Sequence, residues 1–250
     1  MTKILKTEEF INEQVVNEMG MRVRNANIQQ RMTDQLKKYN LVYNEATGLY
    51  DCDGDVKVDK DLVSPDGKLI VKFGVVKGDF DCIGNKLTSL EGAPQEVGGR
   101  FNCGANNLTS LEGAPQKVGG GFYCHDNKLI SLNGSPKKVG GGFYCYVNQL
   151  TSLEGAPYEV GGNFECFSSR LTSLEGSPQK VSGEFDCHNN SLTSLKGAPQ
   201  KVGGNFDCYE NDIVFDETHF YGCLPDVIGG ELDAGPDCDY ELAKNYYNPR

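Results

Sequence analysis

A 21-residue period runs through most of this chain and restricts the folds that are open to it. Phenylalanine recurs seven times at this spacing, and a cysteine follows two positions after each one. The pairs are Phe80/Cys82, Phe101/Cys103, Phe122/Cys124, Phe143/Cys145, Phe164/Cys166, Phe185/Cys187 and Phe206/Cys208. The unit reads F-x-C-x-x-N-x-L-T-S-L-E-G-A-P-x-x-V-G-G-x without insertions. Such a period predicts a solenoid in which each unit forms one coil, numbered here from coil 1 at Phe80 to coil 7 at Phe206.

The unit itself indicates a β-coil. In F-x-C both side chains point to the same face of a short strand, because side chains alternate along a strand. Two leucines and a valine supply further inward positions, while Ala-Pro and Gly-Gly are typical of turns. One coil cannot bury this apolar surface alone, so the core becomes continuous only by stacking. We therefore expect one parallel strand per coil, about 4.8 Å from the next, and an irregular convex side.

An asparagine follows each cysteine by three positions in six of the seven coils. Where the chain leaves a strand, backbone groups lose their partners and need new ones. An asparagine amide both donates and accepts, so it can bridge adjacent coils. Coil 5 has Ser169 instead, and we expect a weaker ladder there. The asparagines are Asn85, Asn106, Asn127, Asn148, Asn190 and Asn211.

The pattern resembles a known repeat family. F-x-C-x-x-N-x-L-x-x-L overlays the leucine-rich-repeat core L-x-L-x-x-N-x-L-x-x-L over residues 76–211. The following P-x-x-V resembles the short bacterial class, which includes the recognition domains of secreted bacterial ubiquitin ligases. The resemblance implies a solenoid whose strand face binds protein partners. Those ligases also have a large catalytic domain with a nucleophilic cysteine, whereas only the short stretch 212–250 follows the repeats here, so we expect no ligase activity.

The repeats, residues 78–211, are followed by a degenerate copy. Residues 225–234 read PDVIGGELDA and match P-x-x-V-G-G-x-F-x-C position by position. Leu232 takes the place of phenylalanine but lies farther from Phe206 than one period, so we place a five-residue insertion within 214–224. Residues 212–250 are thus predicted to be an acidic C-terminal cap with a final strand, which shields the end of the solenoid.

The chain before the repeats divides into two parts. Residues 46–77 are predicted to be an irregular β cap, in which Lys68–Val76 alternates like a strand and Tyr50-x-Cys52 echoes F-x-C. Residues 1–45 are predicted to be helical. A first amphipathic helix begins after Thr7, and a second places Ile28, Met32 and Leu36 on one face. The opening KTEEFINEQ also resembles the short targeting helices of tailed-phage head proteins.

Charge and composition argue against some classes of binding partner. The chain has 24 Lys and Arg against 35 Asp and Glu, a net charge of -11. This acidity argues against nucleic acid and anionic membranes as partners, and no apolar run reaches the length of a membrane span. Ten cysteines without a secretory signal indicate a reducing compartment, a cytoplasm or a virion. Residues 205–250 hold 11 acidic and 2 basic side chains, so 9 of the 11 net negative charges lie there.

Catalytic and metal sites find little support in the sequence. The cysteines of the ladder point into the core and form no C-x2-C pair, so we interpret them as small buried apolar residues. His125 and His188 lie three coils apart, too far to share a zinc ion. His219, Cys223 and Cys238 could form a partial metal site. Asp51, Asp53, Asp55, Asp59 and Asp61 lack the glycine and glutamate of a calcium loop. We expect no enzyme activity, cofactor or metal.

The positions that vary between coils lie on the outer strand face. Aromatic residues gather there on coils 3 to 5, and exposed aromatics are typical interface anchors. The alternative is that they pack only on one another. We therefore expect a non-enzymatic protein-binding module. The alternative function is a structural virion protein attached by its N-terminal helices, and phage or bacterial origin fits both. The candidate partner-binding residues are Tyr123, His125, Tyr144, Tyr146, Glu165, Phe167, Asp186, His188 and Tyr209.

Overall fold

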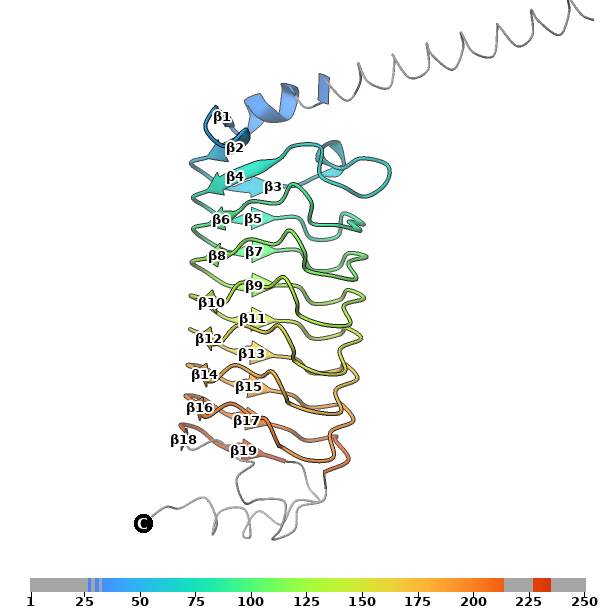
Figure 1. Cartoon of the computed structure of the whole chain (residues 1–250), viewed down its shortest axis with the longest axis vertical. Helices are drawn as coiled ribbons and strands as arrows, with labels where there is room; N and C mark the ends of the chain where they lie inside the picture. Colours follow the sequence, from blue (N-terminus) through green and yellow to red (C-terminus); the bar gives the residue numbers. More distant parts are fainter. Residues whose placement is uncertain (1–26, 28–29, 32, 214–226, 235–250) are drawn as a thin grey trace, which may run out of the picture.

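The chain forms a straight stack of short β-coils, as Figure 1 shows for the computed structural model. The structure describes residues 27, 30–31, 33–213 and 227–234. Within them, coils of about 21 residues stack along one axis in about eight turns, and there is very little helix. The mainly β solenoid predicted from the period is confirmed.

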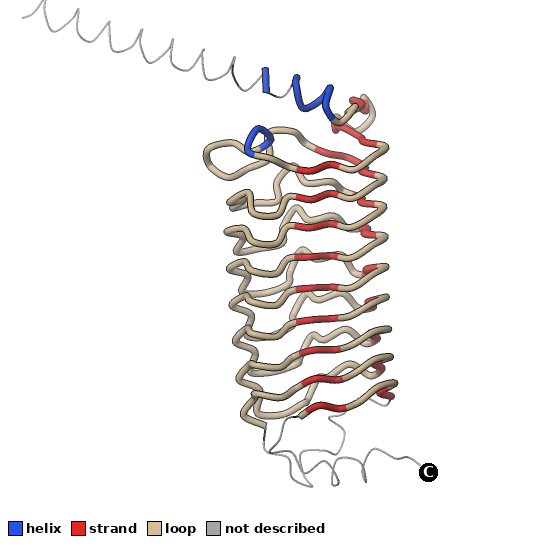
Figure 2. Tube along the Cα trace, turned by 180° about the vertical axis from the view of Figure 1, so that it is seen from behind, coloured by secondary structure: helices blue, strands red, loops and turns tan. Residues whose placement is uncertain are grey.

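Each coil contributes two strands rather than one, so two parallel sheets run along the solenoid (Figure 2). Sheet A has ten strands in the order β1 (Val42–Asn44), β2 (Leu49–Cys52), β4 (Phe73–Val76), β6 (Glu96–Val97), β8 (Lys117–Val118), β10 (Lys138–Val139), β12 (Glu159–Val160), β14 (Lys180–Val181), β16 (Lys201–Val202) and β18 (Val227–Ile228). Sheet B has nine: β3 (Val56–Lys57), β5 (Phe80–Asp81), β7 (Phe101–Asn102), β9 (Phe122–Tyr123), β11 (Phe143–Tyr144), β13 (Phe164–Glu165), β15 (Phe185–Asp186), β17 (Phe206–Asp207) and β19 (Leu232–Asp233).

The expected F-x-C strand is the strand of sheet B. The strand of sheet A comes from the x-V of P-x-x-V-G-G, which we expected to lie on an irregular return path. It contributes one inward side chain, the valine, so its sequence shows no alternation to reveal it. The constant step of the repeat places each residue beside its equivalent: Phe143 pairs with Phe122 on one side and Phe164 on the other.

The core is a set of columns of identical residues. The phenylalanine and cysteine columns are almost completely buried in coils 1 to 7, and the two leucine columns in coils 1 to 6. Neighbouring phenylalanine rings stack, with 5.1 Å between the centroids of Phe122 and Phe143 and 5.4 Å between those of Phe164 and Phe185. Burial of one such ring contributes about 1.5–3 kcal/mol, so the repeated column makes a large contribution to stability.

The asparagine ladder bridges coils as predicted. Asn106 donates from Nδ2 to the carbonyl oxygens of Cys82 and Cys103, each at 3.0 Å. Its Oδ1 accepts from the backbone N–H of Asn85 at 3.0 Å and of Leu87 at 2.9 Å. One side chain therefore replaces several backbone partners lost at the corner of the coil.

Coil 5 interrupts this ladder at Ser169. The hydroxyl oxygen of Ser169 is buried and has no hydrogen-bond partner among the described residues. In coils 3 and 5 the N–H groups of Leu129 and Leu171 donate to the asparagine Oδ1 of the following coil, and Ser169 is the residue that follows coil 4 in this way. A serine side chain is too short to replace that amide. The expected weak point of the ladder is therefore present as an unsatisfied polar group in the interior.

Two glycine columns follow from backbone geometry. Gly113 has a φ of +89°, and its counterparts in the other E-G-A and N-G-S turns have similar values, a conformation that favours glycine. The second residue of each Gly-Gly or Ser-Gly pair lies against the preceding coil. A Cβ added to Gly120 would lie 2.8 Å from the carbonyl carbon of Gly99. Close stacking of coils thus requires glycine there.

The C-terminal end follows the degenerate repeat. Ile228 of β18 pairs with Val202, and Leu232 of β19 pairs with Phe206. The alignment of residues 225–234 with the repeat is therefore confirmed in register. The insertion placed within 214–224 lies outside the described residues, as does the acidic segment after residue 234.

The N-terminal cap differs from our expectation. Tyr50-x-Cys52 lies in sheet A, where Tyr50 pairs with Phe73, and so it is not equivalent to F-x-C. The true equivalent is Val56-x-Val58, since Val56 pairs with Phe80 and both valines are buried. The strand predicted over Lys68–Val76 is limited to β4, after a 3-10 turn at Lys60–Leu62. The cap thus contributes strands to both sheets, although its residues do not match the repeat.

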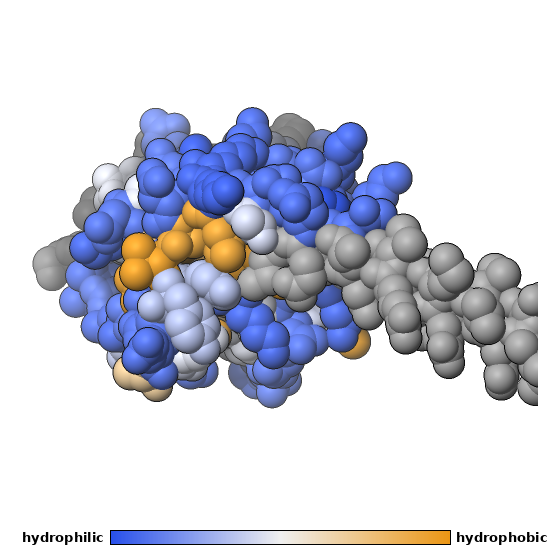
Figure 3. Space-filling model, turned by 90° about the horizontal axis from the view of Figure 1, so that it is seen from above, coloured by the Kyte–Doolittle hydropathy of each residue, from blue (hydrophilic) through white to orange (hydrophobic). Residues whose placement is uncertain are grey.

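The described residues of the N-terminal segment include a short helical stretch at 27, 30–31 and 33–38. It rests on the cap through buried Gln35, and Leu36 is half-buried. The first predicted helix, Ile28 and Met32 lie outside the described residues. Seen along the axis from this end, an apolar patch is surrounded by hydrophilic residues (Figure 3). Strand β1 forms the sheet edge at this end, and its Val42 is 67 % exposed.

Candidate interaction surface on sheet B

Three columns of side chains cover the outside of sheet B, and together we call them the strand face. The first column is the residue before each phenylalanine, the second lies between phenylalanine and cysteine, and the third follows cysteine. The backbone beneath these columns is uniform, because every coil pairs in register. The chemistry of the strand face is therefore set by the outward side chains alone.

The third column contains a continuous stack of five aromatic rings across coils 3 to 7. Successive centroids are 4.8, 4.4, 4.7 and 4.5 Å apart, and the ring planes differ by at most 14°. A parallel pair stacks beside it in the second column, Tyr123 on Tyr144 at 4.4 Å. The five rings are those of His125, Tyr146, Phe167, His188 and Tyr209.

These aromatics are half-buried, which corrects the expectation that they are exposed. The coil spacing of about 4.8 Å is close to the stacking distance of aromatic rings, so each ring covers the faces of its neighbours. The ring edges and the tyrosine hydroxyls remain as the available surface. Burial raises the pKa of Tyr144 to about 12 and lowers the pKa of His125. The aromatic rings of the strand face thus pack on one another.

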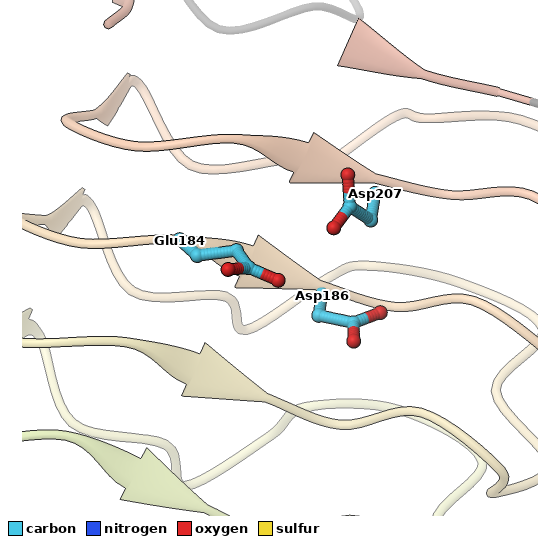
Figure 4. Close-up of side chains that lie close together, drawn as sticks. All are labelled: Glu184, Asp186 and Asp207. Carbon is cyan, nitrogen blue, oxygen red and sulfur yellow. The ribbon is translucent and has the colours of Figure 1, made fainter. Parts of the chain in front are cut away.

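Carboxylates occupy the C-terminal half of the strand face. Glu184, Asp186 and Asp207 lie close together on adjacent coils (Figure 4), each with an oxygen within 4.8 Å of the others. Asp186 is 8 % exposed, and its Oδ1 lies 2.6 Å from Nδ1 of His188. Our sequence analysis named Glu165, Asp186 and His188 but missed Glu184 and Asp207. Glu184 lies in the first column of coil 6, and Asp207 lies in the second column of coil 7. Their outward positions are the signal that would have identified them.

Asp207 has the most perturbed carboxyl group of this cluster. Burial, and next a hydrogen bond with Glu184, raise the pKa of Asp207 to about 7. The negative charges of Glu184, Asp186 and Asp233 act in the same direction. Like charges at this distance favour retention of a proton by one member of the group. Asp207 therefore keeps its proton at higher pH than an ordinary aspartate, and burial also raises the pKa of Glu165.

The outer surface of sheet A provides a contrast in charge. Lys117 pairs with Glu96 at 2.5 Å, and Glu159 pairs with Lys138 at 2.8 Å and Lys180 at 3.5 Å. On the strand face of coils 5 to 7 and the described part of the final coil there is no lysine or arginine. The acidic residues there are Glu165, Glu184, Asp186, Asp207, Glu231 and Asp233. The glutamates of sheet A are paired with lysines of neighbouring coils, whereas the described strand face of coils 5 to 7 presents a negative surface.

The other chemical candidates are structural in the described part of the chain. All eight described cysteines are buried, and burial raises the pKa of thiols such as those of Cys124 and Cys187 well above the usual range. Asp51 and Asp55 accept from the backbone N–H groups of Val75 and Asp79, each at 2.8 Å. These two aspartates therefore satisfy backbone N–H groups at the cap. His219, Cys223 and Cys238 lie outside the described residues.

Three carboxylates are also a possible donor set for a hard cation. Two of the three carboxylates, those of Asp186 and Asp207, already have internal partners, since Asp186 contacts His188 and Asp207 bonds with Glu184.

Among the described residues no helix combines the length and hydropathy of a membrane span. No protein-family model, curated protein or solved structure matches this chain.

Proposed function

We propose that this protein is a non-enzymatic interaction module that binds a partner protein through the strand face, and that it is encoded by a phage or a bacterium. The observation that carries the proposal is the contrast between constant interior columns and a strand face that changes from coil to coil. Interior residues are fixed by packing, whereas outward residues on the same strands are free to vary. A continuous aromatic stack on that variable surface supports binding.

The stack suits an interface because it is already ordered. Each ring in the middle of the column contacts one ring above and one below, as Phe167 does with Tyr146 and His188. Side chains held in this way lose little conformational freedom when a partner binds. Tyrosine edges also combine apolar contact with a hydroxyl that can hydrogen bond. The strand face therefore offers a rigid surface at low entropic cost.

The test is a capture experiment with a matched control. Proteins bound from a lysate of the host are identified by mass spectrometry, and cross-links map the contact on the chain. We expect Tyr144→Ala/Tyr146→Ala to lose the partner, whereas Tyr158→Ala should retain it. Tyr158 is 62 % exposed and lies next to sheet A, so it controls for loss of an exposed tyrosine.

Deletion of residues 1–45 distinguishes binding by the strand face from attachment through the N-terminal segment. Capture that survives Tyr144→Ala/Tyr146→Ala but disappears with the deletion would contradict binding by the strand face. It would instead favour a virion-associated protein attached through its N-terminal segment. Circular dichroism of each variant confirms that the solenoid is retained, since the substituted side chains lie outside the core.

A further inference from the structure

We infer that the part of the partner bound by coils 5 to 7 and the final coil is a cationic polypeptide segment that presents arginine side chains. This inference rests on the proposed function and names the chemistry of the partner. The guanidinium groups would pair with the carboxylates of the first and second columns, and the aliphatic stems would lie along the ring edges of the third column. The strand face of coils 1 to 4 would not select for arginine.

Charge complementarity is the first argument. Six carboxylates occupy this half of the strand face without a lysine or arginine among its described outward residues. Carboxylates directly opposite each other on paired strands, such as Asp186 and Asp207, repel. Sheet A shows that the same fold can neutralise such a column with lysines of its own. No lysine or arginine among the described outward residues of this half balances the carboxylates, and their charge disfavours nucleic acid.

The arrangement of the columns favours arginine over lysine. Asp186 lies two positions before His188 on the same coil, and Asp207 has the same relation to Tyr209, so carboxylates and ring edges run side by side. A guanidinium pairs with carboxylates through two parallel hydrogen bonds, which a lysine ammonium cannot do. The stem of an arginine packs on apolar surface while its head stays polar. Neighbouring carboxylates at the coil spacing offer several such pairs.

The raised pKa of Asp207 supplies a second signature of such binding. Asp207 faces Glu184, Asp186 and His188 from coil 6 and Asp233 and Glu231 from the final coil, with Tyr209 on its own coil. A guanidinium that pairs with Asp207 favours its ionised form, so the proton held by Asp207 leaves on binding. Affinity should therefore rise as the pH rises through about 7.

The probe is a blocked peptide of alternating arginine and serine, measured by fluorescence anisotropy with the full chain at about pH 8 and low salt, where the carboxylates are ionised. We expect Glu184→Gln/Asp207→Asn to weaken binding roughly tenfold or more. The control, Glu112→Gln/Glu154→Gln, changes the net charge equally but alters turn residues away from the strand face. It should change affinity less than about twofold, and a lysine–serine peptide should bind the wild type more weakly.

Proton release is measured by calorimetry in buffers of different ionisation enthalpy. We expect release on binding to the wild type near neutral pH and a smaller release with Asp207→Asn. Equal weakening in both double variants would show only general attraction to an acidic protein and would overturn the inference. Absence of peptide binding to the wild type would overturn it too, while partner capture sensitive to Tyr144→Ala/Tyr146→Ala would leave the proposed function intact.

A second copy of the chain is the other possible occupant, because sheet A carries lysines. Sedimentation velocity of the wild type without peptide tests this. A dimer that is lost in Glu184→Gln/Asp207→Asn but retained in Glu112→Gln/Glu154→Gln would assign the acidic surface to self-association and overturn the inference. A monomer at the concentrations used for peptide binding is the expected result.

Discussion

The interior of each coil and its strand face stack in the same way but under different constraints. Phe164 and Phe185 stack inside sheet B at 5.4 Å, and Phe167 and His188 stack outside it at 4.7 Å. The inner column contains the same residue seven times, whereas the outer one changes from coil to coil. The outer side chains lie together because the coils pair in register. The inner side chains are also restricted to one residue type because they are buried. Side-chain stacking is therefore no measure of structural importance in this fold.

The largest expected effect comes from a matched pair of phenylalanines in coil 5. Phe164→Ala removes a ring that is 0 % exposed and should lower the free energy of unfolding by about 3–5 kcal/mol. Phe167→Ala removes a half-buried outer ring and should cost about 1–2 kcal/mol, mostly from lost stacking. Urea denaturation followed by circular dichroism measures both.

Equal losses would contradict the distinction between the inner and outer stacks. The pair is well controlled because both substitutions remove the same side chain from the same coil. A change in the slope of the urea transition would show that only part of the solenoid unfolds, since repeat proteins do not always unfold as one unit.

A smaller effect, of opposite sign, is expected at Ser169. Ser169→Asn restores the amide of the ladder, which in other coils bonds to the carbonyls of two cysteines. It should also remove the buried unsatisfied hydroxyl, so we expect a gain of about 1–2 kcal/mol in the free energy of unfolding. Ser191→Asn, at an exposed position, is the control and should be nearly neutral. Destabilisation by Ser169→Asn would show that coil 5 has adapted to serine.

The smallest effect concerns pH and the outer surface alone. The pKa of Asp207 is about 7 in the folded chain, against about 3.9 when unfolded, so the folded state binds more protons between these values. Stability contributed by this group should therefore fall as the pH rises from about 4 to about 7 and stay level above that. Asp207→Asn should reduce this slope in thermal unfolding measured across the range. An unchanged slope would contradict the raised pKa of Asp207.

The period predicted most of the fold because one constant step decides every strand pairing. The alignment of Ile228 and Leu232 with Val202 and Phe206 followed from the sequence, although phenylalanine and cysteine are absent from the last coil. The misassignment of Tyr50-x-Cys52 has a physical reason. Outside the repeats an inward pair of large side chains fits either sheet, and only the pairing of Val56 with Phe80 identifies the strand of sheet B.

The candidate surface was predicted less completely. Alternation identified the outward positions, including Tyr146 and Asp186, but it does not describe how side chains meet across coils. Half-burial of the aromatic rings and the contact of Glu184 with Asp207 both arise between neighbouring coils, about one repeat apart in the sequence. A sequence read one unit at a time omits these contacts. Writing the units beneath one another, column by column, would have shown them.

Register pairing of identical residues has a consequence for how such a chain changes over generations. Because Phe143 pairs with Phe122 and Phe164 in the same manner, loss or gain of a whole unit joins two coils that already fit. Recombination between repeated stretches of the gene would lengthen or shorten the molecule in steps of about 4.8 Å. Copy number would then set the reach of the binding surface, independently of the residues that decide what it recognises.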